Sequence, residues 1–97
     1  MTDEQTTQRL NTEGADLLTL AGVNDANLIE LQRQTGTRVA LRGDTLTLVG
    51  TAEAVERAAS VAQRMIDAAK QGTALEADDV LRMSMDGSHE PAGGGDN

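Results

Sequence analysis

Residues 22–50 read GVNDANLIELQRQTGTRVALRGDTLTLVG and contain most of the signals from which the fold follows. Asn24 and Asp25 are residue types that cap helices, because their side-chain oxygens can accept the unpaired N–H groups of a first helical turn. Two leucines one turn apart then share a helical face. Gly36 is suited to end the helix, because glycine adopts the left-handed conformation without a β-carbon clash. The pattern predicts a loop at residues 22–25 followed by a helix.

Period-two alternation over residues 38–49 predicts two β-strands. The dipeptide Gly43-Asp44 interrupts the alternation and is typical of a tight turn between antiparallel strands. One face of this hairpin is apolar and is expected to be buried, which fixes the strand register. The apolar residues are Val39, Leu41, Leu46 and Leu48, and they alternate with Arg38, Ala40, Arg42, Thr45, Thr47 and Val49.

Three further elements flank this stretch. Residues 15–21 read ADLLTLA, a short Leu-rich segment between glycines that predicts a buried strand. Thr51 can cap a long helix that carries an apolar stripe and ends near Gly72. A shorter helix is expected over residues 77–85. The predicted fold class is therefore α/β (α+β), with a three-stranded sheet, helices packed on one face, and the order β-α-β-β-α-α.

At 97 residues the chain has room for one small domain. Residues 1–13 are polar without an apolar period and are expected to form a flexible N-terminal tail. The domain itself is placed at residues 14–86. Residues 87–97, GSHEPAGGGDN, are rich in glycine and are expected to form a flexible tail, or a linker to a following domain.

The formal net charge of −8 is unevenly distributed. Residues 14–70 hold seven acidic and six basic side chains, a net charge of −1, whereas the other residues hold nine acidic and two basic ones, a net charge of −7. The central part is nearly neutral, although phosphate binding is favoured by a positive field. No apolar run approaches the ~20 residues of a membrane span, and the N-terminus does not have the pattern of a signal peptide. We therefore expect a soluble, cytoplasmic protein with no membrane partner.

The order of these motifs resembles a K-homology (KH) nucleic-acid-binding domain, in which a GxxG loop opens a helix that is followed by a Gly-bounded hairpin. It is similar in more detail to the KH-like N-terminal domain of the PhoH-like family of bacterial ATPases, which typically shows G-x-x-D-x-N-L, then R-G-[DN], then a Gly before an Ala-rich helix. The corresponding residues are Gly22, Asp25, Asn27 and Leu28, then Arg42, Gly43 and Asp44, then Gly50. The resemblance spans residues 17–83. It implies a KH-like domain and a cytoplasmic parent P-loop ATPase linked to RNA metabolism, with ATP and Mg²⁺ bound by the parent's ATPase domain.

The resemblance also implies a nucleic-acid site. In KH domains the GxxG loop lets the nucleic-acid backbone approach peptide N–H groups at a helix N-terminus. Asp25 stands at the second glycine position, so the loop is either a phosphate clamp or simply a capped turn. Arg38 and Arg42 share one face of a strand, where they either straddle a backbone phosphate or form the solvated face of the hairpin. The candidate nucleic-acid-binding residues are Gly22, Val23, Asn24, Asp25, Asn27, Arg38 and Arg42.

Two functions of different classes are compatible with these residues. The first is an accessory module of a PhoH-like P-loop ATPase that binds single-stranded RNA weakly. The second is a protein-interaction or oligomerisation module that has lost nucleic-acid binding, with the ATPase domain of the same parent or another protein as its partner. Asp25, the absence of aromatic residues for base stacking and the acidic ends favour the second function, whereas the family resemblance, Arg38 and Arg42 favour the first.

The sequence offers no candidate for catalysis. It has no G-x-x-x-x-G-K-[ST] loop for ATP and no cysteines. His89 has no second histidine with which to complete a metal site. Asp78 and Asp79 stand at the start of a predicted helix, where carboxylates interact favourably with the helix dipole. We therefore expect that this chain is not an enzyme and that it holds no metal and no cofactor of its own.

Overall fold

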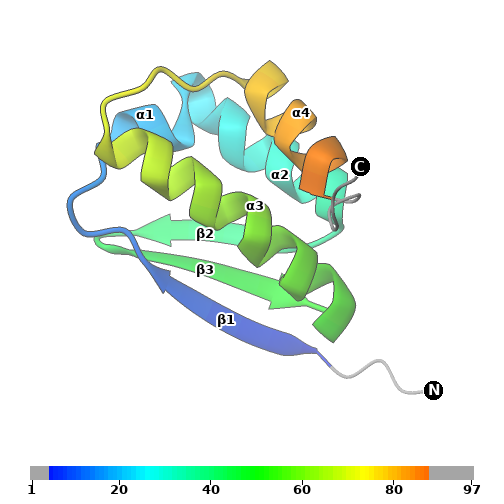
Figure 1. The fold of residues 1–97 in the computed structure, drawn as a ribbon. Coiled ribbons are helices and arrows are strands. Elements are labelled where there is room, and N and C mark those ends of the chain that lie inside the picture. Colours follow the sequence, from blue (N-terminus) through cyan, green and yellow to red (C-terminus); the bar gives the residue numbers. More distant parts are fainter. Residues whose placement is uncertain (1–4, 88–97) are drawn as a thin grey trace, which may run out of the picture.

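The computed structural model describes residues 5–87, in which helices cover one face of a three-stranded antiparallel sheet (Figure 1). Within these residues the strand order is β1-β3-β2, so β3 is central and β1 and β2 are edge strands. Among the described residues, no helix lies on the other face of the sheet (Figure 1). This arrangement confirms the predicted α+β class with helices on one face. The strands are β1 (Thr6–Asn11), β2 (Arg38–Arg42) and β3 (Thr45–Gly50).

The helical segments of the described residues are α1 (Leu17–Ala21), the single 3₁₀ turn η1 (Val23–Asp25), α2 (Ala26–Thr35), α3 (Ala52–Lys70) and α4 (Ala77–Gly87). Helix α3 lies across β1 and β3, whereas α2 packs beside β2. Helix α4 packs against α2 and α3. The first strand, the loop before α2 and the C-terminal helix are thus all joined to one core.

The hairpin of β2 and β3 forms as predicted. Arg42 pairs with Thr45 on either side of the two-residue turn. Leu46 and Leu48 are fully buried beneath the helices, whereas Thr47 between them lies on the other face of the sheet. The alternation in the sequence therefore sets the register correctly.

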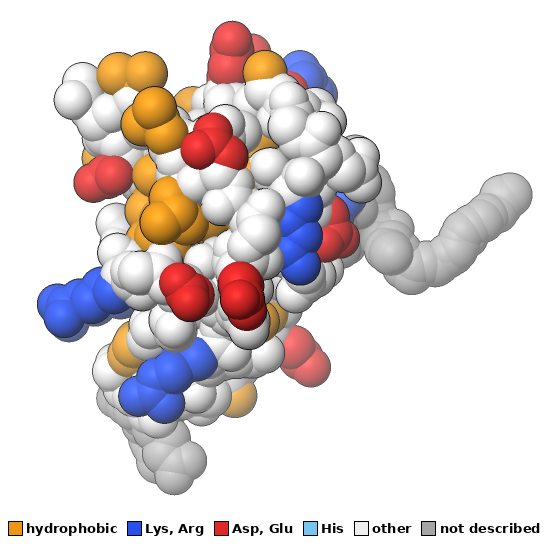
Figure 2. All heavy atoms as spheres, turned by 90° about the vertical axis from the view of Figure 1, so that its left-hand side faces the viewer, with side chains coloured by type: hydrophobic (Ala, Val, Ile, Leu, Met, Phe, Trp, Pro, Cys, Tyr) orange, Lys and Arg blue, Asp and Glu red, His pale blue; other side chains and the backbone are white. Residues whose placement is uncertain are grey.

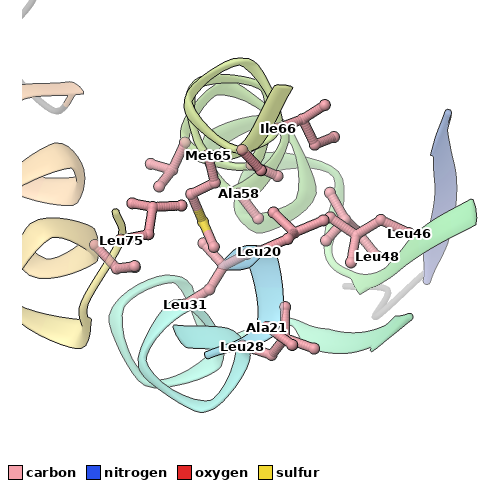
Figure 3. Close-up of a cluster of buried hydrophobic side chains, with 14 of the residues drawn as sticks. Leu20, Ala21, Leu28, Leu31, Leu46, Leu48, Ala58, Met65, Ile66 and Leu75 are labelled. Carbon is pink, nitrogen blue, oxygen red and sulfur yellow. The ribbon is translucent and has the colours of Figure 1, made fainter. Parts of the chain in front are cut away.

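The core lies between the sheet and helices α2 and α3 (Figure 3). Helix α3 supplies a large part of it, because apolar residues recur at three- and four-residue steps along one side of the helix. Thr51 caps this helix as predicted, since its Oγ1 accepts the N–H of Ala54 at 3.1 Å. The buried residues of α3 are Val55, Ala58, Val61, Ala62, Met65, Ile66 and Ala69.

The predicted flexible tail over residues 1–13 is wrong for Thr6–Asn11, which forms β1. All six residues of this strand pair with β3, and the domain therefore begins before residue 14. The strand has little apolar periodicity because most of its side chains are exposed, and Leu10 packs against the core. Its pairing uses backbone groups, which do not depend on side-chain polarity. Residues 1–4 lie outside the described part of the chain.

The predicted strand over residues 15–21 is also wrong, because Leu17–Ala21 forms helix α1. The N–H of Leu20 donates to the carbonyl of Asp16 at 2.9 Å, which is a helical bond across four residues. The neighbours Leu20 and Ala21 are both buried, and the alternating directions of side chains along a strand do not give this pattern. The β-α-β-β-α-α order holds with β1 as its first strand and α1 as an additional helix.

The remaining boundaries agree closely with the predictions. Helix α2 is followed by Gly36, which has the expected left-handed conformation with a φ of 75°. Helix α4 begins at Ala77 and continues to Gly87. The rest of the predicted C-terminal tail, residues 88–97, lies outside the described residues. Across residues 5–87, every helix is too short or too polar to span a lipid bilayer.

Candidate functional site

A groove lies between α2 and β2, on the side of the domain where β2 is the edge strand. Its volume of about 290 Å³ is at the small end of the range for ligand sites. The helix contributes mainly apolar side chains, and the strand contributes its edge. The lining residues are Asp25, Leu28, Ile29, Gln32, Val39, Ala40 and Leu41.

The predicted loop connects α1 to α2 and brings Asp25 to this groove. Gly22 has a φ of 81° and a ψ of 173°, a conformation that is essentially restricted to glycine. Asn24 and Asp25 are both left-handed, with φ values of 56° and 62°, which these two residue types tolerate better than other non-glycine residues. The side-chain cap predicted at Asn24 or Asp25 is wrong: the N-cap of α2 is Asp25, whose carboxylate does not bond to the helix, because a capping residue needs an extended backbone.

Asn27 is a buried anchor of this loop. Its side chain is 1% exposed, and its Nδ2 group donates to the carbonyl oxygens of Thr19, Leu20 and Leu75 at 3.1, 3.3 and 3.2 Å. These carbonyls belong to α1 and to the segment between α3 and α4, so a single amide joins three parts of the chain. The Nδ2 group of Asn27 is therefore enclosed and already bonded, which gives this residue a structural role, and its nucleic-acid-binding role stays a prediction.

Gln32 joins α2 to the edge of β2. Its Oε1 accepts the N–H of Val39 at 2.9 Å. Peptide groups of an antiparallel edge strand point alternately toward the partner strand and away from it. Leu41 follows two residues after Val39, so its N–H also points away from β3, toward the groove. The strand thus presents backbone groups to any molecule that occupies the groove.

Arg38 and Arg42 do not line the groove. They lie with Ala40 on the face of the sheet that carries no helix, because Val39 and Leu41 between them pack against the core. Both arginines are exposed, and neither forms an ion pair within residues 5–87. The two arginines and the loop therefore lie on opposite sides of β2.

The lining of the groove combines apolar side chains with polar groups, and Asp25 is the one charged residue of that lining. Arg33, on α2, is paired with Glu30 at 3.4 Å. Val23 in the loop and Ile29 on α2 are 76% and 48% exposed. In Figure 2, exposed hydrophobic side chains gather toward the upper left with acidic side chains beside them, and Lys and Arg side chains project from the lower left. Within the described part of the chain, no basic side chain therefore lines the groove.

Ile29 and Gln32 are candidate site residues that the motif pattern does not identify. Both lie on the side of α2 that faces β2. They are three residues apart, and this spacing places both on one side of α2. That spacing, applied to the predicted helix and hairpin, is the signal by which they could be found.

Within residues 5–87, no three His, Cys, Asp or Glu side chains lie together as a possible metal site. No protein-family model matches the sequence, and no curated protein matches it. The groove, the loop and the uncovered face of the sheet are therefore the features that bear on function.

Proposed function

We propose that the chain is the KH-like accessory module of a cytoplasmic PhoH-like P-loop ATPase and that it binds single-stranded RNA weakly. The chain itself is then not an enzyme, and ATP and Mg²⁺ are bound by the parent's ATPase domain. The observation that carries the proposal is the groove between α2 and β2, with the loop of Gly22–Asp25 beside it. In a KH-like site a loop of this kind clamps the nucleic-acid backbone.

The groove offers surfaces that suit an unstacked nucleotide. Leu28 and Ile29 form an apolar wall for a base, and Leu41 of the edge strand lines the groove from the opposite side. Proteins that recognise single-stranded RNA bind splayed bases by such contacts and by hydrogen bonds to the base edges. The chain has no aromatic residue, so it lacks base stacking, which contributes about 1–3 kcal/mol per base elsewhere. Weak binding follows from this lack.

Asp25 weakens binding further, because its carboxylate lies where the loop meets the groove. Repulsion between unit charges 4 Å apart is about 1 kcal/mol in bulk water and about 4 kcal/mol at the effective dielectric constant of a protein surface. These energies correspond to roughly a fivefold to several-hundredfold change in affinity. The Asp25 charge is therefore the most direct point at which to test the proposal.

The test is a titration of a labelled ten-nucleotide single-stranded RNA into wild type and Asp25→Asn. Asparagine removes the charge and still tolerates the left-handed backbone of this position. We expect Asp25→Asn to bind at least about fivefold more tightly than wild type. Asp67→Asn, an exposed position on α3, is the matched control for net charge. Equal affinities for the two variants would contradict the proposal.

A protein-interaction module is the second candidate function, and apolar side chains exposed around the loop favour it. Leu18, Val23 and Ile29 are 73%, 76% and 48% exposed. A groove beside a strand edge also suits an extended peptide, which adds to the sheet while its side chains fill the groove. In that case Ile29→Asp abolishes binding of the parent's ATPase domain, and the RNA titrations do not distinguish Asp25→Asn from Asp67→Asn.

A further inference from the structure

The face of the sheet opposite the helices, here called the open sheet face, is polar and basic. The strand register aligns three rows of residues across it, each with one residue from every strand. The rows are Thr7, Val49 and Arg38; Arg9, Thr47 and Ala40; and Asn11, Thr45 and Arg42.

The open sheet face is positively charged, whereas the chain as a whole carries a negative net charge. Arg9, Arg38 and Arg42 are exposed, and none of them forms an ion pair within the described residues 5–87. None of the nine positions holds an acidic residue, although the chain has a formal net charge of −8. Asp44, in the turn between β2 and β3, lies at the rim, where it lines a recess together with Arg9.

We propose that the open sheet face binds the phosphate backbone of the same RNA strand that occupies the groove, an inference that rests on the proposed function. Ala40 connects the two surfaces, because it belongs to the middle row of the open sheet face and also lines the groove. An RNA strand that leaves the groove and crosses β2 first reaches Arg38 or Arg42 and then reaches Arg9.

The positions of the arginines suit an extended polyanion. Arg38 and Arg42 are four residues apart on one strand, about 13 Å, and Arg9 is two strands away, about 10 Å. Guanidinium groups bind phosphate oxygens in a bidentate manner. Hydroxyl and amide side chains also contact phosphate oxygens in nucleic-acid complexes, and Thr45 and Thr47 lie between the arginines.

The open sheet face suits phosphate better than it suits an acidic protein. Stable protein interfaces have a centre of apolar or aromatic side chains that become fully buried. Among the nine positions the apolar residues are Ala40 and Val49, and the central position is Thr47. The open sheet face therefore offers an acidic protein basic side chains but no apolar centre that could be buried.

The experiment compares two triple variants in the Asp25→Asn background, with a labelled ten-nucleotide single-stranded RNA at several salt concentrations. One variant combines Arg9→Gln, Arg38→Gln and Arg42→Gln. The control removes the same charge from exposed positions of α3 and combines Arg57→Gln, Arg64→Gln and Lys70→Gln.

We expect the variant of the open sheet face to lose about tenfold or more in affinity at the lowest salt concentration. Its plot of log affinity against log salt should be shallower by about 2, because each phosphate contact to a single strand contributes about 0.7. The control should change affinity by less than about threefold, since distant charges are screened. Equal losses in the two triple variants would overturn the proposal.

Asp44→Asn in the same background provides a test of opposite sign that does not depend on the loss of binding. Removing this carboxylate from the rim should tighten RNA binding by about two- to fivefold. Unchanged RNA affinity in Asp44→Asn would overturn the proposal, because RNA bound to the open sheet face should be repelled by a negative charge at its rim.

Ile29→Asp in the same background separates the failure of this inference from the failure of the proposed function. If Ile29→Asp abolishes RNA binding while the arginine variant binds RNA normally, the inference about the open sheet face is overturned. The groove then remains the RNA site. If the arginine variant loses binding while Ile29→Asp binds normally, the groove is not the RNA site. RNA then binds to the open sheet face alone. If a ten-residue polyglutamate competes as well as RNA, the face docks acidic protein and the RNA assignment is overturned.

Discussion

Gly22 and Asn27 are in such close contact that a β-carbon on Gly22 would lie 2.8 Å from Cγ of Asn27. The glycine also has a φ of 81°, and the asparagine amide donates to three backbone carbonyls from α1 and the segment before α4. The pair therefore fixes the position of the loop beside the groove. The spacing of five residues between them is a packing requirement, independent of whether the loop binds a ligand.

We predict that Gly22→Ala and Asn27→Ala each lower the free energy of unfolding by about 2 kcal/mol or more. The alanine at position 22 meets both a strained backbone and the Asn27 side chain, whereas Asn27→Ala leaves buried carbonyls without a donor. Urea unfolding measures both changes. Gly43→Ala is the control, because Gly43 also has a positive φ but open space around it, so its cost should be limited to about 1 kcal/mol.

The double variant of Gly22 and Asn27 tests the contact itself. Asn27→Ala removes the side chain with which the new β-carbon collides, so the double variant should be more stable than the sum of the single changes by at least about 0.5 kcal/mol. Strictly additive losses would show that the two side chains do not interact.

We predict that Asp25→Gly raises the free energy of unfolding by about 0.5 kcal/mol. Asp25 is left-handed and its side chain does not cap α2, so glycine relieves backbone strain without the loss of a capping bond. Part of the gain is offset by the greater freedom of glycine in the unfolded chain. Asp25→Asn should be nearly neutral in the same urea experiment. A loss of about 1 kcal/mol in Asp25→Gly would mean that Asp25 does cap the helix.

Thr12 gives a prediction about burial of a polar group. Its side chain is 1% exposed, and its Oγ1 has no hydrogen-bond partner among residues 5–87. Thr12→Val keeps the shape and removes the hydroxyl, so the free energy of unfolding should rise by about 1 kcal/mol. Thr35→Val is the matched control, because Thr35 Oγ1 bonds to the carbonyl of Leu31 at 2.7 Å and its removal should cost about 1 kcal/mol. A loss in both variants would contradict this account of Thr12.

The hairpin and α3 are the parts of the fold that the sequence predicts well, and the reason is local. Leu46 and Leu48 alternate with threonines on a strand with one buried face. Thr51 and the apolar stripe after it specify the start and the buried side of α3. In both elements the side-chain pattern and the burial have the same period.

The N-terminal region has no such match between side-chain pattern and burial. Strand β1 is polar because its pairing with β3 comes from backbone groups and most of its side chains are exposed, so no periodicity marks it. Helix α1 is too short to show a helical period, and its run of leucines is equally typical of a strand. Tertiary contacts decide both elements.

The candidate site was predictable in part. The loop of Gly22–Asp25 does lie beside a groove, because the helix after it packs beside β2. The sequence could not show that Asn27 is buried, because that depends on carbonyls distant along the chain, such as that of Leu75. It also could not show that Arg9 shares a face with Arg38, because no side-chain periodicity marks β1 as a strand.

The most direct measurement of the central claim is a titration of ¹⁵N-labelled Asp25→Asn with a ten-nucleotide single-stranded RNA, followed by backbone amide chemical shifts. The groove between α2 and β2 predicts that the largest shifts fall at residues 22–29 and 39–41, and that they saturate in the micromolar to sub-millimolar range. Saturating shifts confined to α4, or no shifts up to millimolar RNA, would contradict the claim that this groove binds RNA.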